Sequence, residues 1–344
     1  MDSAFQLDIA GGGPGLVSAG VVFNEAGWVI SDSVGSDTVI FGAVNNATVI
    51  SSSGVGVNEI AATLGANNSG ATSNYNIFTG AGNTLVLSGD TAFDSGDTAF
   101  TKTGSGTLVI APDANFAAGL ADGFTVANGT VLVNGTFDAS LFNYAVTVGN
   151  GGTLGGTGSS SIGNQFAYDI ESGGVFSPGG GGAFGDSIGS FDIARSSGGP
   201  ASGDGVFTFE SGSTFRVDLD DLGNSDTLTF DAAGTDAQEL TLVIESGVDL
   251  DLWGTVDTSA TYDLITLAGP ETIYDGSAFG TVSFNGEVLT PFDDFVVTYT
   301  PIAETDIGVG GVQIQVLVPE PGAMVLVSLG GLVLVGRGRG AREG

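Results

Sequence analysis

Short apolar runs recur in the middle of the chain at a nearly constant distance. Four of them begin directly after a threonine and lie 23 residues apart, at Leu85, Leu108, Val131 and Leu154. Val175 follows after 21 residues and Phe215 after a further 40, a gap that we interpret as two shorter periods. A constant period of about 20 to 25 residues with one strand in each copy is typical of a solenoid.

The repeats favour strands over helices. Runs such as residues 107–110 (TLVI) are rich in β-branched side chains and end at Gly, Asn, Asp or Ser, whereas no stretch of ten residues has helical spacing. Glycine at this density would also cost about 1 kcal/mol at each helical position. We therefore predict an all-β chain, folded as a right-handed parallel β-helix (β-solenoid) whose rungs stack their inward side chains on one another.

Strand-like runs extend this prediction in both directions. Val29, Val39 and Val49 lie ten residues apart, which predicts either successive strands of one rung or a short meander. Beyond Phe230, longer acidic loops separate five more runs, at residues 240–245, 261–268, 280–284, 295–300 and 311–318. The chain is accordingly divided into N-terminal rungs (1–80), a repeat-bearing β-helix (81–230), a β-rich cap and stalk (231–317, the stalk being 301–318) and a tail (318–344).

Composition removes several classes of function. The chain has 60 glycines in 344 residues, 39 acids against 6 cations, and neither Cys nor His. Thiol and imidazole chemistry are therefore excluded, and a net charge of −33 argues against nucleic acid as a partner. The 22 phenylalanines nevertheless indicate a packed core rather than disorder.

The tail combines three features in a fixed order. A Pro-Glu-Pro motif (Pro319, Glu320 and Pro321) precedes an uncharged apolar stretch of 15 residues (322–336), which a basic tip follows: Arg337, Arg339 and Arg342. At ~1.5 Å per residue the stretch reaches roughly 22 Å, which predicts a short, transiently held transmembrane segment. Arginines behind it would keep the tip in the cytoplasm and leave the body outside.

This tail resembles the PEP-CTERM sorting signal. The resemblance implies that an exosortase recognises Pro319, Glu320 and Pro321, that the three arginines act as a membrane-retention tip, and that the protein is exported by a Gram-negative bacterium. It also implies an association with extracellular polysaccharide. Because Met1 to Asp8 carry no basic residue before an apolar run, we expect a signal peptide upstream of the given sequence; an intracellular protein is the alternative.

The repeats also resemble a known family. The phrases TKTGSGTLVIA (101–111) and FTVANGTVLVNG (124–135) are similar to the autotransporter-associated β-strand repeats of passenger domains, over about residues 82–230. The resemblance implies a passenger-like β-helix. The sequence lacks a C-terminal membrane β-barrel segment, so autotransporter secretion is not expected.

Acidic clusters are the candidate metal ligands. If Asp218 and Asp220 alternate on one strand, they and Asp221 are weak candidates for a calcium site, because calcium prefers oxygen ligands. A solvated acidic edge that blocks strand pairing is the stronger interpretation. No specific cofactor is predicted, although so acidic a chain is expected to bind Ca²⁺ diffusely.

Catalysis is not predicted. Residues 1–336 contain three cations, of which we place Lys102 at a corner and pair Arg216 with Asp218, and Arg195 stands alone. Three scattered cations do not form a cleft for an anionic glycan. We therefore expect a structural or adhesive protein of the cell surface or extracellular matrix, the alternatives being a glycan hydrolase on the same scaffold and an inert stalk.

Overall fold

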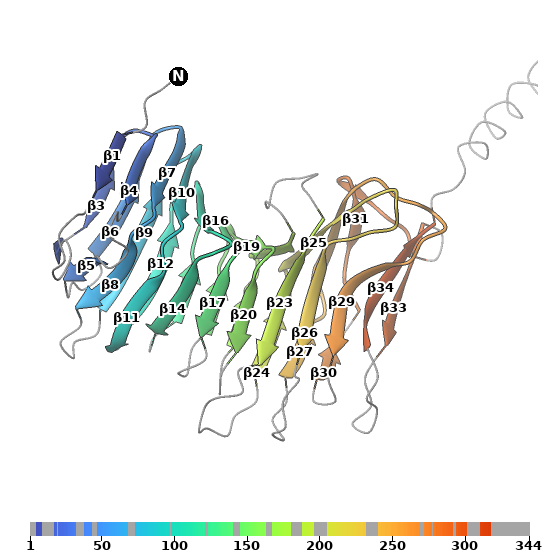
Figure 1. Cartoon of the computed structure of the whole chain (residues 1–344). Helices are drawn as coiled ribbons and strands as arrows, with labels where there is room; N and C mark the ends of the chain where they lie inside the picture. Colours follow the sequence, from blue (N-terminus) through green and yellow to red (C-terminus); the bar gives the residue numbers. More distant parts are fainter. Residues whose placement is uncertain are drawn as a thin grey trace, which may run out of the picture.

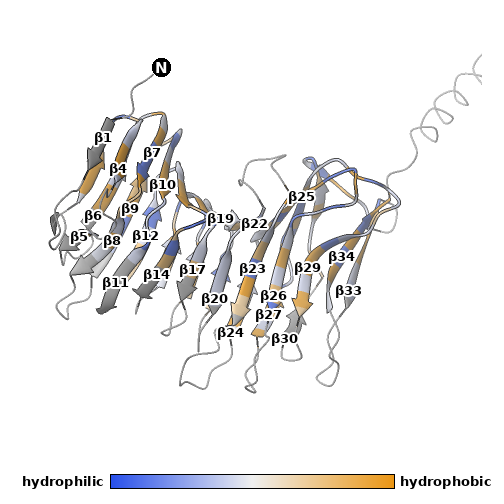
Figure 2. Ribbon diagram, viewed as in Figure 1, coloured by the Kyte–Doolittle hydropathy of each residue, from blue (hydrophilic) through white to orange (hydrophobic). Residues whose placement is uncertain are grey.

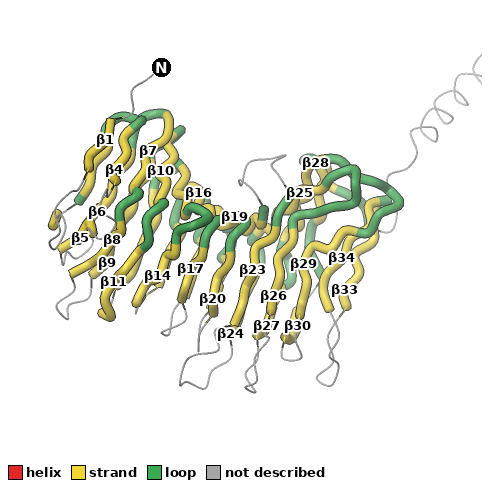
Figure 3. The backbone as a smooth tube through the Cα atoms, viewed as in Figure 1, coloured by secondary structure: helices red, strands yellow, loops and turns green. Residues whose placement is uncertain are grey.

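The chain is all-β in a computed structural model. The structure describes most of residues 5–317, and in that part it contains strands and loops but no helix (Figure 3). The residues outside the description are 1–4, 9–16, 19, 32–37, 43–46, 68–72, 97, 121–122, 140–144, 163–166, 180–187, 196–204, 232–239, 269–271, 277, 292–293, 301–309 and 318–344.

The strands form three long sheets, here called A, B and C. Sheet A contains, in order, β1 (Phe5–Asp8), β4 (Trp28–Ser31), β7 (Gly56–Ile60), β10 (Asn83–Leu87), β13 (Thr107–Ile110), β16 (Gly129–Val133), β19 (Gly152–Gly156), β22 (Val175–Pro178), β25 (Thr214–Leu219), β28 (Asp249–Gly254), β31 (Val282–Phe284) and β32 (Glu287–Val288). Sheet B contains β2 (Val17–Ser18), β5 (Thr38–Gly42), β8 (Thr63–Asn67), β11 (Thr91–Gly96), β14 (Asn115–Leu120), β17 (Thr136–Ala139), β20 (Ser159–Ile162), β23 (Ser190–Arg195), β26 (Thr227–Asp231), β29 (Tyr262–Ala268), β34 (Gly310–Val316) and β33 (Phe295–Thr300). Sheet C contains β3 (Val21–Phe23), β6 (Ala47–Ser52), β9 (Ser73–Thr79), β12 (Thr98–Thr103), β15 (Gly123–Val126), β18 (Ala145–Val148), β21 (Ala167–Ile170), β24 (Gly205–Phe209), β27 (Leu240–Ile244) and β30 (Thr272–Gly276).

Successive strands enter sheets A, B and C in turn. Each strand therefore pairs in parallel with the strand three places later, as β10 does with β13 and β13 with β16. A parallel pair needs a long crossover between its strands, and here the strands of the other two sheets supply it. Figure 1 shows the turns following one another from β1 to β34. The all-β prediction is confirmed, and this strand order is compatible with a β-solenoid.

The register explains the 23-residue period. Leu85 lies beside Leu108 in sheet A, and the same column continues through Val131 to Leu154. All four side chains are buried. One period is therefore one passage through the three sheets, and it returns an apolar side chain to the same place in the core.

Two details of the repeat prediction are wrong. The column continues from Leu154 to Phe176 rather than to its neighbour Val175, which lies beside Thr153. Phe176 is then paired directly with Phe215, 39 residues on, so this interval is one rung and not two. The additional residues lie in the connections before and after β23.

The flanking runs belong to the same body. Val29, Val39 and Val49 fall in β4, β5 and β6, one strand in each sheet, which confirms the single-rung interpretation. Beyond Phe230 the five predicted runs correspond to β27, β29, β31, β33 and β34, and the sequence patterns missed β28, β30 and the two-residue β32. Strand β34 runs antiparallel between β29 and β33, so this part of the expected stalk is a largely buried strand.

Aromatic side chains fill much of the core. The rings of Tyr168 and Phe207 stack with centroids 5.0 Å apart, and those of Phe116 and Phe137 stack at 5.3 Å. Where Ser160 replaces an aromatic residue in the column after Phe137, the hydroxyl of Tyr168 donates a hydrogen bond to its Oγ (2.7 Å). Figure 2 shows apolar residues along strands from one end of the body to the other. Many of the phenylalanines of the described residues thus belong to one continuous core.

Candidate functional site

The predicted calcium ligand Asp218 is buried in β25. Its backbone N–H donates to Oδ2 of Asp226 (3.1 Å), and the N–H of Asp226 donates to the carbonyl of Asp218 (2.9 Å). Oδ1 of Asp226 also accepts a hydrogen bond from the N–H of Gly189 (2.9 Å). These contacts tie β25 to the connection that precedes β23.

Asp220 lies beyond the end of β25, in a turn. Its Oδ1 accepts hydrogen bonds from the N–H groups of Leu222 (2.9 Å) and Asn224 (2.8 Å), and its Oδ2 accepts one from the Asn224 side chain (2.8 Å). These bonds, led by that of the Asn224 side chain, lower the pKa of Asp220. The carboxylate therefore closes its own turn.

The three candidate ligands occupy three different settings. Asp218 is in a buried strand, Asp220 caps a turn, and Asp221 is exposed. The strand ends at Leu219, so the alternation expected from Asp218 to Asp220 stops before the second residue. Within the described ranges, no group of three acidic side chains is arranged to hold a metal ion.

Arg216 has a different partner from the expected one. Its Nε lies 3.1 Å from Oδ2 of Asp251, which is its register partner on β28. Oδ1 of Asp251 accepts a further hydrogen bond from the hydroxyl of Ser283 (2.7 Å). The predicted pairing with Asp218 is wrong because Arg216 reaches across to the next rung rather than along its own strand.

Lys102, for which a corner position was predicted, is fully buried near the end of β12. It alternates with Phe100 on β12, so its stem follows the inward column between Ile77 and Val126. At the strand end its ammonium donates to three carbonyl oxygens, those of Thr103 (3.0 Å), Gly104 (2.8 Å) and Asn128 (3.1 Å). All three N–H groups thus have an acceptor, while burial lowers the pKa of the amine to about 8.

A second acidic feature, which we name the glutamate ladder, consists of Glu171, Glu210 and Glu245. Each is the first residue after a strand of sheet C (β21, β24 and β27) and begins the tripeptide Glu-Ser-Gly. Because these strands are neighbours, the three glutamates occupy equivalent places in successive rungs, ~4.8 Å apart. The repeated tripeptide is the sequence signal that could have revealed this ladder.

Hydrogen bonds join the ladder from rung to rung. The N–H of Ser211 donates to Oε2 of Glu245 (3.0 Å), and the N–H of Ser172 is bonded in the same way to Glu210. Desolvation, followed by repulsion from Glu171, Asp169 and Glu245, raises the pKa of Glu210. The ladder is therefore a surface row of mutually repelling carboxylates that the backbone holds in place.

Replacing Glu210 with Gln should stabilise the protein at pH 7 by about 0.5 kcal/mol. The folded state holds the Glu210 proton to a higher pH than the unfolded state, so wild-type stability falls as pH rises through that window. Gln keeps an acceptor for Ser172 and removes the charge. Urea unfolding should show the gain at pH 7 and none at pH 3. Glu25→Gln, at an exposed site far from the ladder, is the control; equal gains in both variants would contradict the ladder explanation and indicate net charge alone.

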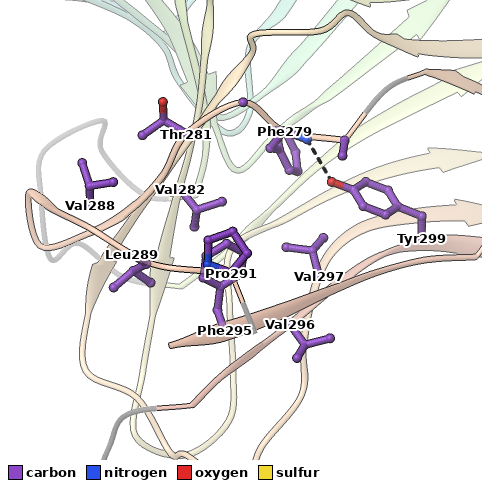
Figure 4. A pocket seen from close by; sticks show the side chains of 12 residues that line it. Phe279, Thr281, Val282, Val288, Leu289, Pro291, Phe295, Val296, Val297 and Tyr299 are labelled. Atoms are coloured by element: carbon purple, nitrogen blue, oxygen red, sulfur yellow. Dashed lines mark hydrogen bonds between the residues drawn. The ribbon is translucent and has the colours of Figure 1, made fainter. Parts of the chain in front are cut away.

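The C-terminal end of the body contains an apolar hollow of about 440 Å³. It lies between the β31–β32 hairpin and β33, and its lining includes Phe279, Val282, Val288, Leu289, Phe295 and Val297 (Figure 4). The N–H of Phe279 donates to the hydroxyl of Tyr299 (3.0 Å) across one side of it. The hollow has the size of a ligand pocket, and none of the described residues that line it is charged.

The remaining predicted features lie outside the described residues. These are the Pro-Glu-Pro motif, the apolar stretch 322–336 and the arginines of the tip, together with the side chain of Arg195. In the ranges that are described, there is no helix of the length and apolarity needed to cross a membrane. No known protein family matches the chain, and no curated protein matches it either.

Proposed function

We propose that this chain is an exported bacterial protein of the cell surface or extracellular matrix. Its body is a right-handed β-solenoid with a structural or adhesive role, and its tail is a sorting signal that an exosortase processes. The observation that carries the proposal is the order within the tail: Pro319 to Pro321, then the uncharged stretch 322–336, then the arginine tip.

The shape of the body supports this role. The ten strands of sheet C, spaced ~4.8 Å apart, extend over about 43 Å. Strands β1 and β34 lie at opposite ends of the body (Figure 1), and the tail follows β34 directly. A membrane that held the tail would therefore lie at one end, with the N-terminal rungs farthest from the cell.

The excess of carboxylates suggests how the surface of the body would bind matrix polysaccharide. Carboxylates outnumber cations by 39 to 6, and the glutamate ladder presents some of them in a regular row. Divalent cations would bridge such carboxylates to acidic polysaccharide of the matrix. In this proposal the body spaces and presents its surface, and it catalyses no reaction.

Processing is tested on the native protein in its own cells. We expect an intact mass that ends near Pro319 to Pro321, and fractionation with the envelope or matrix. Replacing Pro319, Glu320 and Pro321 with Ala should leave a chain that still carries residues 322–344. Pro112→Ala, in an exposed turn of the body, is the control. A full-length wild-type chain in the soluble cytoplasmic fraction would overturn the proposal.

Cation bridging is tested by sedimenting the protein with matrix polysaccharide. Retention should fall severalfold when a chelator removes calcium, because the two polyanions then repel each other. The triple variant E171Q/E210Q/E245Q should be retained less than wild type. Retention that is the same with and without calcium would remove the basis of the bridging mechanism.

A further inference from the structure

The apolar hollow is the open end of the core. The ring of Phe279 stacks on that of Phe215 (centroids 6.3 Å apart), and its centroid also lies 6.3 Å from that of the Tyr299 ring. Beyond this point the described part of the chain leaves the hollow unfilled, and Val288 at its rim is 72% exposed. An apolar surface of this kind is the usual site for another apolar segment.

Strand β34, which precedes the tail in the sequence, ends beside a residue that lines the same hollow. Val316, the last residue of β34, is the register partner of Phe295, which lines the hollow. Residues 317–321 span at most about 17 Å when extended. The apolar stretch 322–336 therefore begins within reach of the hollow.

We propose that the hollow binds the chain's own residues 322–336 whenever the tail is outside a membrane. Both partners are apolar and uncharged, so their contact leaves no charge buried. The arginines of the tip would meanwhile lie against a body with 38 acids and 3 cations in residues 1–336. This inference adds an intramolecular shield to the proposed sorting function.

Cysteine pairs test the contact, because the wild-type chain contains no Cys. Leu326→Cys is combined with Val288→Cys or with Thr281→Cys, two exposed positions of the hollow. In the control it is combined with Val55→Cys, which is 84% exposed and lies in the N-terminal rungs. The purified full-length variants are oxidised in dilute buffer without lipid, and disulfides are counted by intact mass.

We expect intrachain disulfides to form at least ten times faster in both hollow pairs than in the control pair. Equal rates in all three, or no disulfide in either hollow pair, would overturn the proposal. A predominance of interchain disulfides would also overturn it, because a second copy would then be the occupant. These outcomes are independent of processing in cells, so the failure of this inference is distinguishable from the failure of the sorting proposal.

Discussion

Replacing Lys102 with Met should lower the free energy of unfolding by about 3 kcal/mol. The methionine fits the inward column of sheet C, but it cannot donate to the carbonyls of Thr103, Gly104 and Asn128. Those oxygens then lose a charged donor at a partly buried rung end. Urea unfolding followed by circular dichroism measures the change.

Thr101→Met is the matched control. Thr101 precedes Lys102 on β12 with its side chain on the outer, half-buried face, so the same new side chain should change stability by less than about 0.5 kcal/mol there. Unchanged or increased stability of Lys102→Met would contradict the prediction. It would mean that the cost of burying the ammonium exceeds the value of its three hydrogen bonds.

The pH dependence of the same pair of proteins gives an independent check. The folded pKa of Lys102 is about 8, below its ordinary value of 10.5, so between these values the unfolded state binds more protons. The contribution of Lys102 to the free energy of unfolding therefore rises as pH increases from about 8 to 10.5. The difference between wild type and Lys102→Met should grow over that window, whereas the effects of other groups cancel.

Gly129→Ala should destabilise the body by about 4 kcal/mol or more. Gly129 has a φ of +74°, and an added Cβ would lie 2.3 Å from the carbonyl oxygen of Gly104 and 2.6 Å from that of Gly106. It would also lie 2.9 Å from Nζ of Lys102. The two shortest contacts are with the backbone of the preceding rung, so relief requires neighbouring rungs to separate.

Gly27→Ala separates this clash from backbone strain. Gly27 has a φ of +90° with nothing within 4 Å of the added Cβ, so its substitution should cost only the left-handed conformation, about 1 kcal/mol. Because stacked rungs can open locally, both variants should be compared by amide hydrogen exchange as well as by the midpoint of urea unfolding. Equal losses in the two variants would contradict the explanation by close packing.

The repeat period was predictable because it follows from the core. Leu85 and Leu108 occupy one column, and every rung must return an apolar side chain there. The shift from Val175 to Phe176 was not predictable by the same route, because both residues are apolar and adjacent. Spacing alone also cannot distinguish a loop insertion from an additional rung, which is why the interval to Phe215 was misinterpreted.

The candidate sites were less predictable than the fold. Lys102 is in phase with buried Phe100, which indicates an inward side chain, but a lysine is rarely buried and a corner position was therefore predicted. The partner of Arg216 depends on the register between β25 and β28, which a single sequence does not contain. The hollow depends on how the β31–β32 hairpin packs against the β33–β34 hairpin, which the spacing of apolar residues does not predict.

The strand order has a consequence for how the body assembles. A rung requires only the residues of the next turn, so a chain that emerges N-terminus first can add rungs one at a time, without waiting for its far end. Strand β34 is the exception, because it inserts between β29 and β33 and completes sheet B only when Val316 is available. Because the tail directly follows β34 in the sequence, folding from the N-terminus would complete the three sheets before the proposed sorting signal emerges.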